Sequence, residues 1–250
     1  MDKYTKINEK VISNWKEKFN FYWMIPISHD DFVKAEKGEN LLKVTPYKIV
    51  PYTWYSNCKN NEVLGLAAGG GQQMAIFAAL GAKCTLLDIS EEQIEADLFV
   101  SQRENYNINC IKGDMSERLP FPDESFDIVI NPVSNHYIKD IDFLFKEIYR
   151  VLKKGGLFIA GLENEIYWVV NTKTNKLEYK LPIDPLSDEN LYNKLISEGQ
   201  ALQFSHTTTE QIKGQLKAGF RLIDIYDDTE EGIFEELNLS TFIATLSIKE

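Results

Sequence analysis

Residues 63–73 of this 250-residue chain read VLGLAAGGGQQ, an apolar run that leads into a glycine-rich turn. The run from Val63 to Ala68 is typical of a buried strand. Residues 72–80, QQMAIFAAL, then have the composition of a helix that ends before Gly81. A strand, a glycine turn and a helix in this order bring backbone N–H groups close to a ligand. The segment alone also fits an ordinary tight loop, so its interpretation depends on the strands that follow.

Polar residues end each of the next predicted strands. The strand at residues 84–88 ends in Asp88, seventeen residues after Gly71. In nucleotide-binding α/β proteins a carboxylate about 20 residues beyond the glycine turn accepts hydrogen bonds from a ribose. Two further strands end in the same manner: Gly113-Asp114 follows residues 109–112, and Asn131-Pro132 follows residues 126–130. Because parallel sheets bind ligands at the carboxyl ends of their strands, we expect these residues to surround one site.

Two longer motifs resemble a known enzyme family. Residues 119–129, LPFPDESFDIV, and residues 147–157, EIYRVLKKGGL, resemble the segments around the fourth and fifth strands of class I S-adenosylmethionine-dependent methyltransferases of the bacterial small-molecule type. The resemblance covers residues 62–161 and extends more weakly to the C-terminus. It implies a Rossmann-like α/β fold with a seven-stranded, mostly parallel sheet, helices on both faces and an antiparallel last strand. It also implies S-adenosyl-L-methionine as cofactor and S-adenosyl-L-homocysteine as product.

The same resemblance assigns residues to the cofactor. It implies that Gly69 and Gly71 flank the methionine part, Asp88 the ribose and Asp114 the adenine amino group. The other residues expected at the cofactor are Tyr22, Ala67, Ala68, Gln72, Gln73, Ile89, Ser90, Gly113, Met115, Asn131, Pro132 and Asn135.

Two positions depart from the family's pattern. Gly65 stands where the family has an acidic residue, and Ala67 replaces its first glycine. Because alanine tolerates fewer backbone angles than glycine, we expect the turn to start later, around Gly69.

The remaining segments are expected to complete a single methyltransferase domain over residues 1–250. In the N-terminal segment, residues 1–60, apolar side chains recur every four residues from Ile7 to Phe19 and predict an amphipathic helix. Trp15 and Tyr22 match an N-terminal pair in related methyltransferases, so this helix covers either the sheet edge or, as a lid, the cofactor.

The core and the C-terminal part are divided by an insertion. Residues 62–161 alternate strands and helices, and the glycine pair 155–156 is expected to end the last of these helices before a strand at 157–160. Residues 162–206 interrupt the alternation and are interpreted as a small substrate cap. Residues 207–250 supply one more helix and two closing strands.

Composition narrows the possible partners. The net charge of −11 argues against binding to nucleic acid, whose affinity depends on Lys and Arg. The sequence has neither a long apolar run nor a signal-peptide pattern, so we expect a cytoplasmic protein without a membrane span.

Its three cysteines are scattered and are interpreted as reduced core thiols. The three histidines lie far apart, and no metal site is expected. A small-molecule substrate is expected, and the sequence does not address the oligomeric state.

Residues 131–137, NPVSNHY, contain the candidate for acid–base chemistry. Methyl transfer from a sulfonium needs alignment of the two reactants, and it needs a base only when the acceptor must lose a proton. His136 is the candidate general base because its ordinary pKa lies near neutrality. The alternative is a structural histidine at a helix start. Asn131-Pro132 begins like the Asn-Pro-Pro-Tyr motif of amino-group methyltransferases, but Val133 and Ser134 depart from it.

Two other functional classes share part of this pattern. A nicotinamide-dependent oxidoreductase also has a glycine turn and an acidic residue after its second strand, but it needs a phosphate-sized glycine pattern and a proton relay. A non-catalytic S-adenosylmethionine-binding or interaction protein would share the cofactor site. Titration with S-adenosylmethionine and with a dinucleotide distinguishes the first alternative, and a methyl-transfer assay distinguishes the second.

Overall fold

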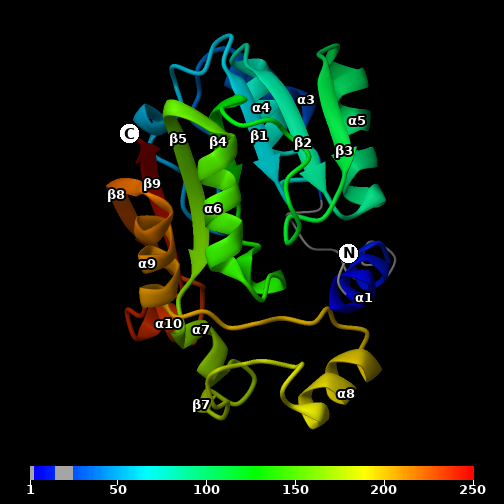
Figure 1. The fold of residues 1–250 in the computed structure, drawn as a ribbon, viewed down its shortest axis with the longest axis vertical. Coiled ribbons are helices and arrows are strands. Elements are labelled where there is room, and N and C mark those ends of the chain that lie inside the picture. Colours follow the sequence, from blue (N-terminus) through cyan, green and yellow to red (C-terminus); the bar gives the residue numbers. More distant parts are fainter. Residues whose placement is uncertain (1–2, 15–24) are drawn as a thin grey trace.

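The computed structural model describes residues 3–14 and 25–250 and has a seven-stranded sheet at its centre (Figure 1). The strands are β1 (Glu62–Leu66), β2 (Lys83–Asp88), β3 (Ile108–Lys112), β4 (Phe126–Asn131), β5 (Leu152–Glu163), β8 (Phe220–Asp228) and β9 (Phe242–Lys249). Their order is β3-β2-β1-β4-β5-β9-β8. Strands β1 to β5 are parallel, and β9 lies antiparallel between β5 and β8. The expected sheet, with its antiparallel last strand, is confirmed.

Helices cover both faces of this sheet. The described helices are α1 (Lys3–Ile12), α3 (His29–Glu36), α4 (Gln73–Ala79), α5 (Glu91–Glu104), α6 (Ile141–Val151), α7 (Ile166–Val169), α8 (Glu189–Ser197), α9 (Thr208–Ala218) and α10 (Ile233–Glu236). Helices α3, α4 and α5 pack on one face, and α6 and α9 pack on the other (Figure 1). Side-chain oxygens cap five of them at the N-terminus: Ser28 for α3, Ser90 for α5, Asp140 for α6, Asp188 for α8 and Thr207 for α9.

The central strands β1 and β4 are apolar in their middle residues because both of their faces are buried. Val63 and Leu64 are adjacent in β1 and fully buried, yet they belong to hydrophobic clusters on opposite sides of the sheet. Ile128 and Val129 of β4 divide in the same way. Successive side chains of a strand point to opposite faces, so the middle of a strand between two helical layers is apolar at consecutive positions.

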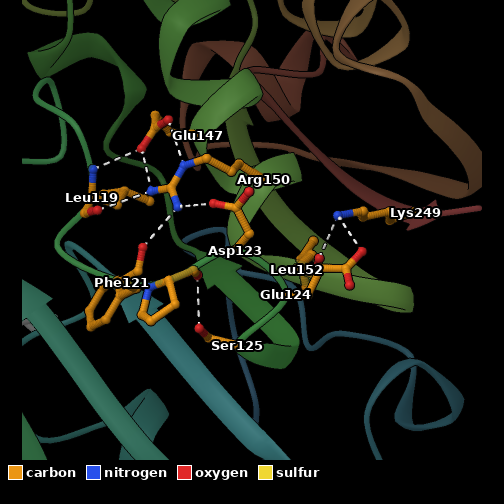
Figure 2. Close-up of polar contacts among 10 residues, drawn as sticks. Leu119, Phe121, Asp123, Glu124, Ser125, Glu147, Arg150, Leu152 and Lys249 are labelled. Atoms are coloured by element: carbon orange, nitrogen blue, oxygen red, sulfur yellow. Dashed lines mark hydrogen bonds and ion pairs between the residues drawn. The ribbon is translucent and has the colours of Figure 1, made fainter.

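Arg150 of α6 anchors the segment that leads into β4, far from the carboxyl ends of the strands (Figure 2). Its guanidinium donates to the Glu147 carboxylate at 2.9 and 2.7 Å and to the carbonyl oxygens of Leu119 and Phe121 at 3.0 and 2.8 Å. Glu147 also accepts the Leu119 N–H at 2.9 Å. The Arg150 guanidinium holds the pKa of Glu147 below its usual range.

The glycine pair 155–156 does not end helix α6, so that expectation was wrong. Helix α6 ends at Val151, and β5 begins immediately with Leu152. Pairing with β4 then jumps from Leu152 to Leu157, and Gly155 adopts a φ of +79° inside this irregular stretch. The two glycines therefore allow a bulge in the strand rather than a helix terminus.

The segment between β5 and α9 lies below the carboxyl ends of the parallel strands, as does α1 (Figure 1). It contains α7, a two-stranded hairpin of β6 (Val170–Asn171) and β7 (Lys176–Leu177), and α8. Its returning stretch is attached to α1, because the Asn8 side chain donates to the Leu202 carbonyl at 2.9 Å and accepts the Leu202 N–H at 2.7 Å. Tyr4 and Phe204 add an edge-to-face ring contact at 5.2 Å.

Candidate functional site

A cavity of about 470 Å³ lies where the carboxyl ends of the parallel strands meet α1 and the segment after β5. Its wall includes most of the residues predicted from the sequence: Ala67, Ala68, Gly69, Gln72, Gln73, Asp88, Ile89, Gly113, Asp114, Met115, Pro132 and His136. Residues that the sequence analysis missed also line it, among them Thr5, Asn8, Ile12, Lys43, Thr45, Gln93, Glu163, Tyr167, Trp168, Gln203 and Phe242. Several hundred Å³ is the usual size of a small-molecule or cofactor site.

The glycine turn begins at Ala67, not at Gly69, so the expected later start was wrong. Ala67 adopts a φ of +46°, and Gly70 and Gly71 adopt +117° and +74°. The Ala67 N–H donates to the Leu87 carbonyl at 2.9 Å, which ties the residue to β2 despite its left-handed conformation. For a residue with a Cβ this conformation costs about 1–2 kcal/mol, which the neighbouring sheet contacts offset.

Close packing explains the other departure from the family's pattern. A Cβ placed on Gly65 would lie 2.5 Å from the Met74 sulfur, so the position has no room for an acidic side chain. A Cβ on Gly69 would lie 2.6 Å from the Gln93 Cβ and 2.7 Å from an Asp88 oxygen. Helix α4, helix α5 and the turn therefore approach each other at distances that only glycine permits at these two positions.

The N–H groups of the three glycines all donate to carboxylates of this chain. The Gly69 N–H donates to Asp88 Oδ2 at 3.1 Å. The Gly70 and Gly71 N–H groups donate to Asp97 Oδ2 at 2.9 and 2.8 Å. A pyrophosphate would need these donors free and would meet two carboxylates beside them. This arrangement argues against a nicotinamide dinucleotide and is compatible with a cationic ligand.

The carboxylates around the turn are deeply buried. Burial raises the pKa of Asp88 to about 6, although the N–H groups of Ser90 and Gly69 oppose the shift. Burial likewise raises the pKa of Asp97 to about 7, against the N–H groups of Gly71 and Gly70. Asp114 is 8% exposed, and its Oδ2 is buried without a hydrogen-bond partner among the described residues. An unpartnered buried carboxylate oxygen matches a ligand amino group as donor.

Four predicted cofactor residues lie behind the cavity wall, and one lies outside the described residues. Ser90 caps α5 and donates its N–H to Asp88 Oδ1 at 2.9 Å. The Asn131 amide donates to the Leu66 carbonyl at 3.0 Å and to Ser134 at 2.8 Å. Gly71 and Asn135 are buried beside the wall. Tyr22 falls outside the described residues, as do Trp15 and Phe19.

His136 forms a buried acid–base pair that the sequence analysis only half identified. It lies in the 3-10 turn η3 (Asn135–Tyr137), and its Nδ1 contacts the carboxylate of Glu163, the last residue of β5. The side chains are 12% and 3% exposed. Burial lowers the pKa of His136, so the imidazole is neutral near pH 7. No described residue hydrogen-bonds to Nε2, and the ring lines the cavity, so Nε2 remains available to a ligand.

The described residues show no metal site and no membrane helix. Within residues 3–14 and 25–250, no three His, Cys, Asp or Glu side chains gather in a way that could hold a metal ion. None of the helices in that part of the chain is long and apolar enough to cross a bilayer.

Comparisons with known proteins identify the family. A family model described as a methyltransferase domain matches residues 64–160. The uncharacterized methyltransferase YbaJ of Bacillus subtilis is 36% identical over 234 residues, which cover 91% of each chain. A crystal structure of an S-adenosylmethionine-dependent methyltransferase from Mesorhizobium loti superposes with a TM-score of 0.61 at 18% identity, covering 77% of this chain and 92% of that one. A putative S-adenosylmethionine-dependent methyltransferase from Listeria monocytogenes gives 0.60 at 17% identity, covering 97% and 99%. The chain belongs to the class I S-adenosylmethionine-dependent methyltransferases.

Proposed function

We propose that this methyltransferase acts on a small-molecule acceptor enclosed in the cavity, with His136 as the general base. The observation that carries the proposal is the placement of the His136–Glu163 pair on the wall of the same cavity as Asp88 and Asp114. The cofactor residues and the acid–base pair therefore share one enclosed space.

The residues present fit S-adenosylmethionine. Asp88 would accept hydrogen bonds from the ribose hydroxyls, and the unpartnered oxygen of Asp114 would accept one from the adenine amino group. Lys43 is the one lysine or arginine among the described cavity-lining residues, and it would pair with the methionine carboxylate. When bound, the cofactor supplies a methyl group activated by the positive charge on sulfur.

His136 would remove the acceptor's proton. Its neutral imidazole can accept a proton at Nε2, because Glu163 holds Nδ1 and thereby sets the tautomer. As Nε2 is protonated, the adjacent carboxylate balances the new positive charge in a water-poor environment. The backbone also orients the ring, since the His136 carbonyl accepts the Phe204 N–H at 2.7 Å.

The covers of the cavity support a small acceptor rather than a macromolecule. Thr5, Asn8 and Ile12 of α1 form one wall, which we propose as a lid, and the segment 162–206 forms another, which we propose as the substrate cap. The carboxylates in the wall and the net charge of −11 oppose a nucleic acid. All three cysteines are free thiols, which supports a cytoplasmic location.

Ligand titration tests the cofactor assignment. We expect S-adenosylhomocysteine to bind and NAD to bind at least a hundredfold more weakly in isothermal calorimetry. Asp88→Asn should weaken S-adenosylhomocysteine binding about tenfold, since a hydrogen bond to a charged group contributes about 1.5–3 kcal/mol. Asp30→Asn, at an exposed aspartate of α3, is the matched control. Equal affinity for NAD would contradict the assignment.

Turnover tests the general base. His136→Ala should lower kcat by a factor of about 100 to 10,000 on an acceptor that must lose a proton, while S-adenosylhomocysteine affinity is retained. His29→Ala, at a histidine 67% exposed, provides the control. Unchanged turnover in His136→Ala would show that His136 is not the base, and binding without turnover in the wild type would favour a non-catalytic role.

A further inference from the structure

We infer that the acceptor is a planar, uncharged aromatic compound that is methylated on a ring hydroxyl group. The inference rests on the proposed function and concerns the part of the cavity that lies around His136, here called the acceptor chamber. Its walls include Val133, His136, Glu163, Tyr167, Trp168 and Phe242.

Aromatic rings form a continuous surface in the acceptor chamber. The ring centroids of Trp168 and His136 are 5.9 Å apart, and those of Tyr167 and Trp168 are 5.4 Å apart. Tyr167 in turn lies 5.3 Å from Phe242, which is 5% exposed. Rings of this kind prefer stacked or edge-on partners and contribute about 0.5–1.5 kcal/mol per ring pair beyond burial of area. This surface therefore selects a flat apolar body.

The charges in the acceptor chamber select an uncharged acceptor. The Glu163 carboxyl group is buried there beside His136, and none of the six wall residues named above is a lysine or arginine that could pair with an anion. Asp88 and Asp114 line the same cavity. An anionic acceptor, such as a carboxylate or phosphate ester, would be repelled by these groups. An acceptor with an ammonium group would pair with the Glu163 carboxylate and would therefore compete with His136 for it.

The donors and acceptors in the chamber match a hydroxyl group. The Trp168 indole N–H is buried without a partner among the described residues, and an acceptor oxygen would satisfy it. His136 Nε2 is available as a proton acceptor. In the transfer, the hydroxyl proton moves to Nε2 and the oxygen bonds to the methyl carbon. The electron pair of the broken carbon–sulfur bond stays on sulfur, which becomes a neutral thioether.

Binding of four related probes to the S-adenosylhomocysteine complex tests the acceptor class. 2-Naphthol is planar and hydroxylated, naphthalene lacks the hydroxyl, decahydro-2-naphthol lacks the flat rings, and 2-naphthoate carries a negative charge. We expect 2-naphthol to bind at least tenfold more tightly than each of the others in calorimetry. Trp168→Leu should weaken 2-naphthol about tenfold and leave S-adenosylhomocysteine unchanged. Phe99→Leu, at a side chain 57% exposed, is the control.

A second measurement tests Glu163 as the positioning residue for His136. With S-adenosylmethionine, the wild type should convert 2-naphthol to its methyl ether, with one S-adenosylhomocysteine formed per ether. Glu163→Gln should lower kcat at least tenfold with KM for 2-naphthol unchanged. It should also move the acid limb of the pH–rate profile to lower pH, because the imidazolium loses its carboxylate. If Glu163 only supported the fold, the acid limb of the pH–rate profile would stay at the same pH in Glu163→Gln.

The outcomes separate this inference from the proposed function. If S-adenosylhomocysteine binds but 2-naphthol does not, or if 2-naphthoate or decahydro-2-naphthol binds as tightly, the aromatic acceptor is refuted and the proposed function stands. If Trp168→Leu leaves 2-naphthol affinity unchanged, the aromatic surface does not select the acceptor and the inference fails. If S-adenosylhomocysteine itself does not bind, the proposed function fails as well.

Discussion

Asp97 gives the sharpest test of the electrostatics around the glycine turn. This carboxylate is fully buried in α5, and one of its oxygens accepts the N–H groups of Gly70 and Gly71. Asp97→Asn keeps an oxygen for those two donors and removes the ability to ionise. The new amide N–H₂ replaces an oxygen that has no partner among the described residues, so its cost does not depend on pH.

The size of this pH-dependent difference in stability follows from the difference in the pKa of Asp97 between the folded and the unfolded chain. Burial raises the pKa of Asp97 from 3.8 to about 7. A carboxyl whose pKa is higher in the folded than in the unfolded chain stabilises the fold at low pH, and this stability is lost as the pH rises from about 4 to about 7. At about 1.4 kcal/mol per pH unit, the wild type should lose about 3 kcal/mol relative to Asp97→Asn between pH 5 and pH 8.

Urea denaturation of both proteins at pH 5, 6, 7 and 8 measures this difference, and the exposed Asp30→Asn exchange corrects for general charge effects. We expect the advantage of Asp97→Asn to grow steadily with pH up to about 7. Asp97→Ala, which removes the acceptor of both glycine N–H groups, should weaken S-adenosylhomocysteine binding, while Asp97→Asn should not. A pH-independent difference would refute the reasoning, and so would an advantage that grows toward low pH, since the two N–H bonds would then outweigh burial.

Three further predictions concern the packing and the hydrogen bonds of the fold. Gly65→Ala should lower the free energy of unfolding by about 1–3 kcal/mol in urea denaturation, because its Cβ would lie 2.5 Å from the Met74 sulfur; an unchanged midpoint would mean that Met74 moves freely. Arg150→Met leaves Glu147 without its main partner and should cost about 3 kcal/mol or more in the same assay, and a loss below 1 kcal/mol would contradict the anchoring role. Asn8→Ala should speed amide hydrogen exchange at Leu202 without changing exchange in the sheet, and an unchanged rate at Leu202 would show that the two hydrogen bonds are not what holds α1 there.

The sheet and half of the site follow from local sequence. Strands β2 and β4 were visible as apolar runs that end in a polar residue, because their middle residues are buried and their carboxyl ends meet at the cavity. The same rule applies to Glu163, but the expected strand stopped at residue 160, and the actual strand continues to Glu163. A strand extended by three residues would have identified the partner of His136.

Other features depend on contacts that a linear pattern does not contain. Asp97 is an acidic residue on the buried side of α5, beside Ile94 and Val100, and only this mismatch of polarity marks it. The left-handed Ala67 is stabilised by Leu87 on the neighbouring strand, so residue propensity alone predicted the turn wrongly. Lys43 reaches the cavity from a segment without regular secondary structure, and Trp168 reaches it from the short helix α7. Tertiary packing sets the course of both segments.

The pair of hydrogen bonds between Asn8 and Leu202 joins positions separated by 194 residues. Closing a loop of this length carries a large entropic cost, and contacts between such distant positions form after local ones in most folding reactions. The α/β core can therefore assemble while α1 is still detached. The cavity is completed only when α1 meets the stretch around Leu202, so ligand affinity should be among the last properties that a refolding molecule acquires.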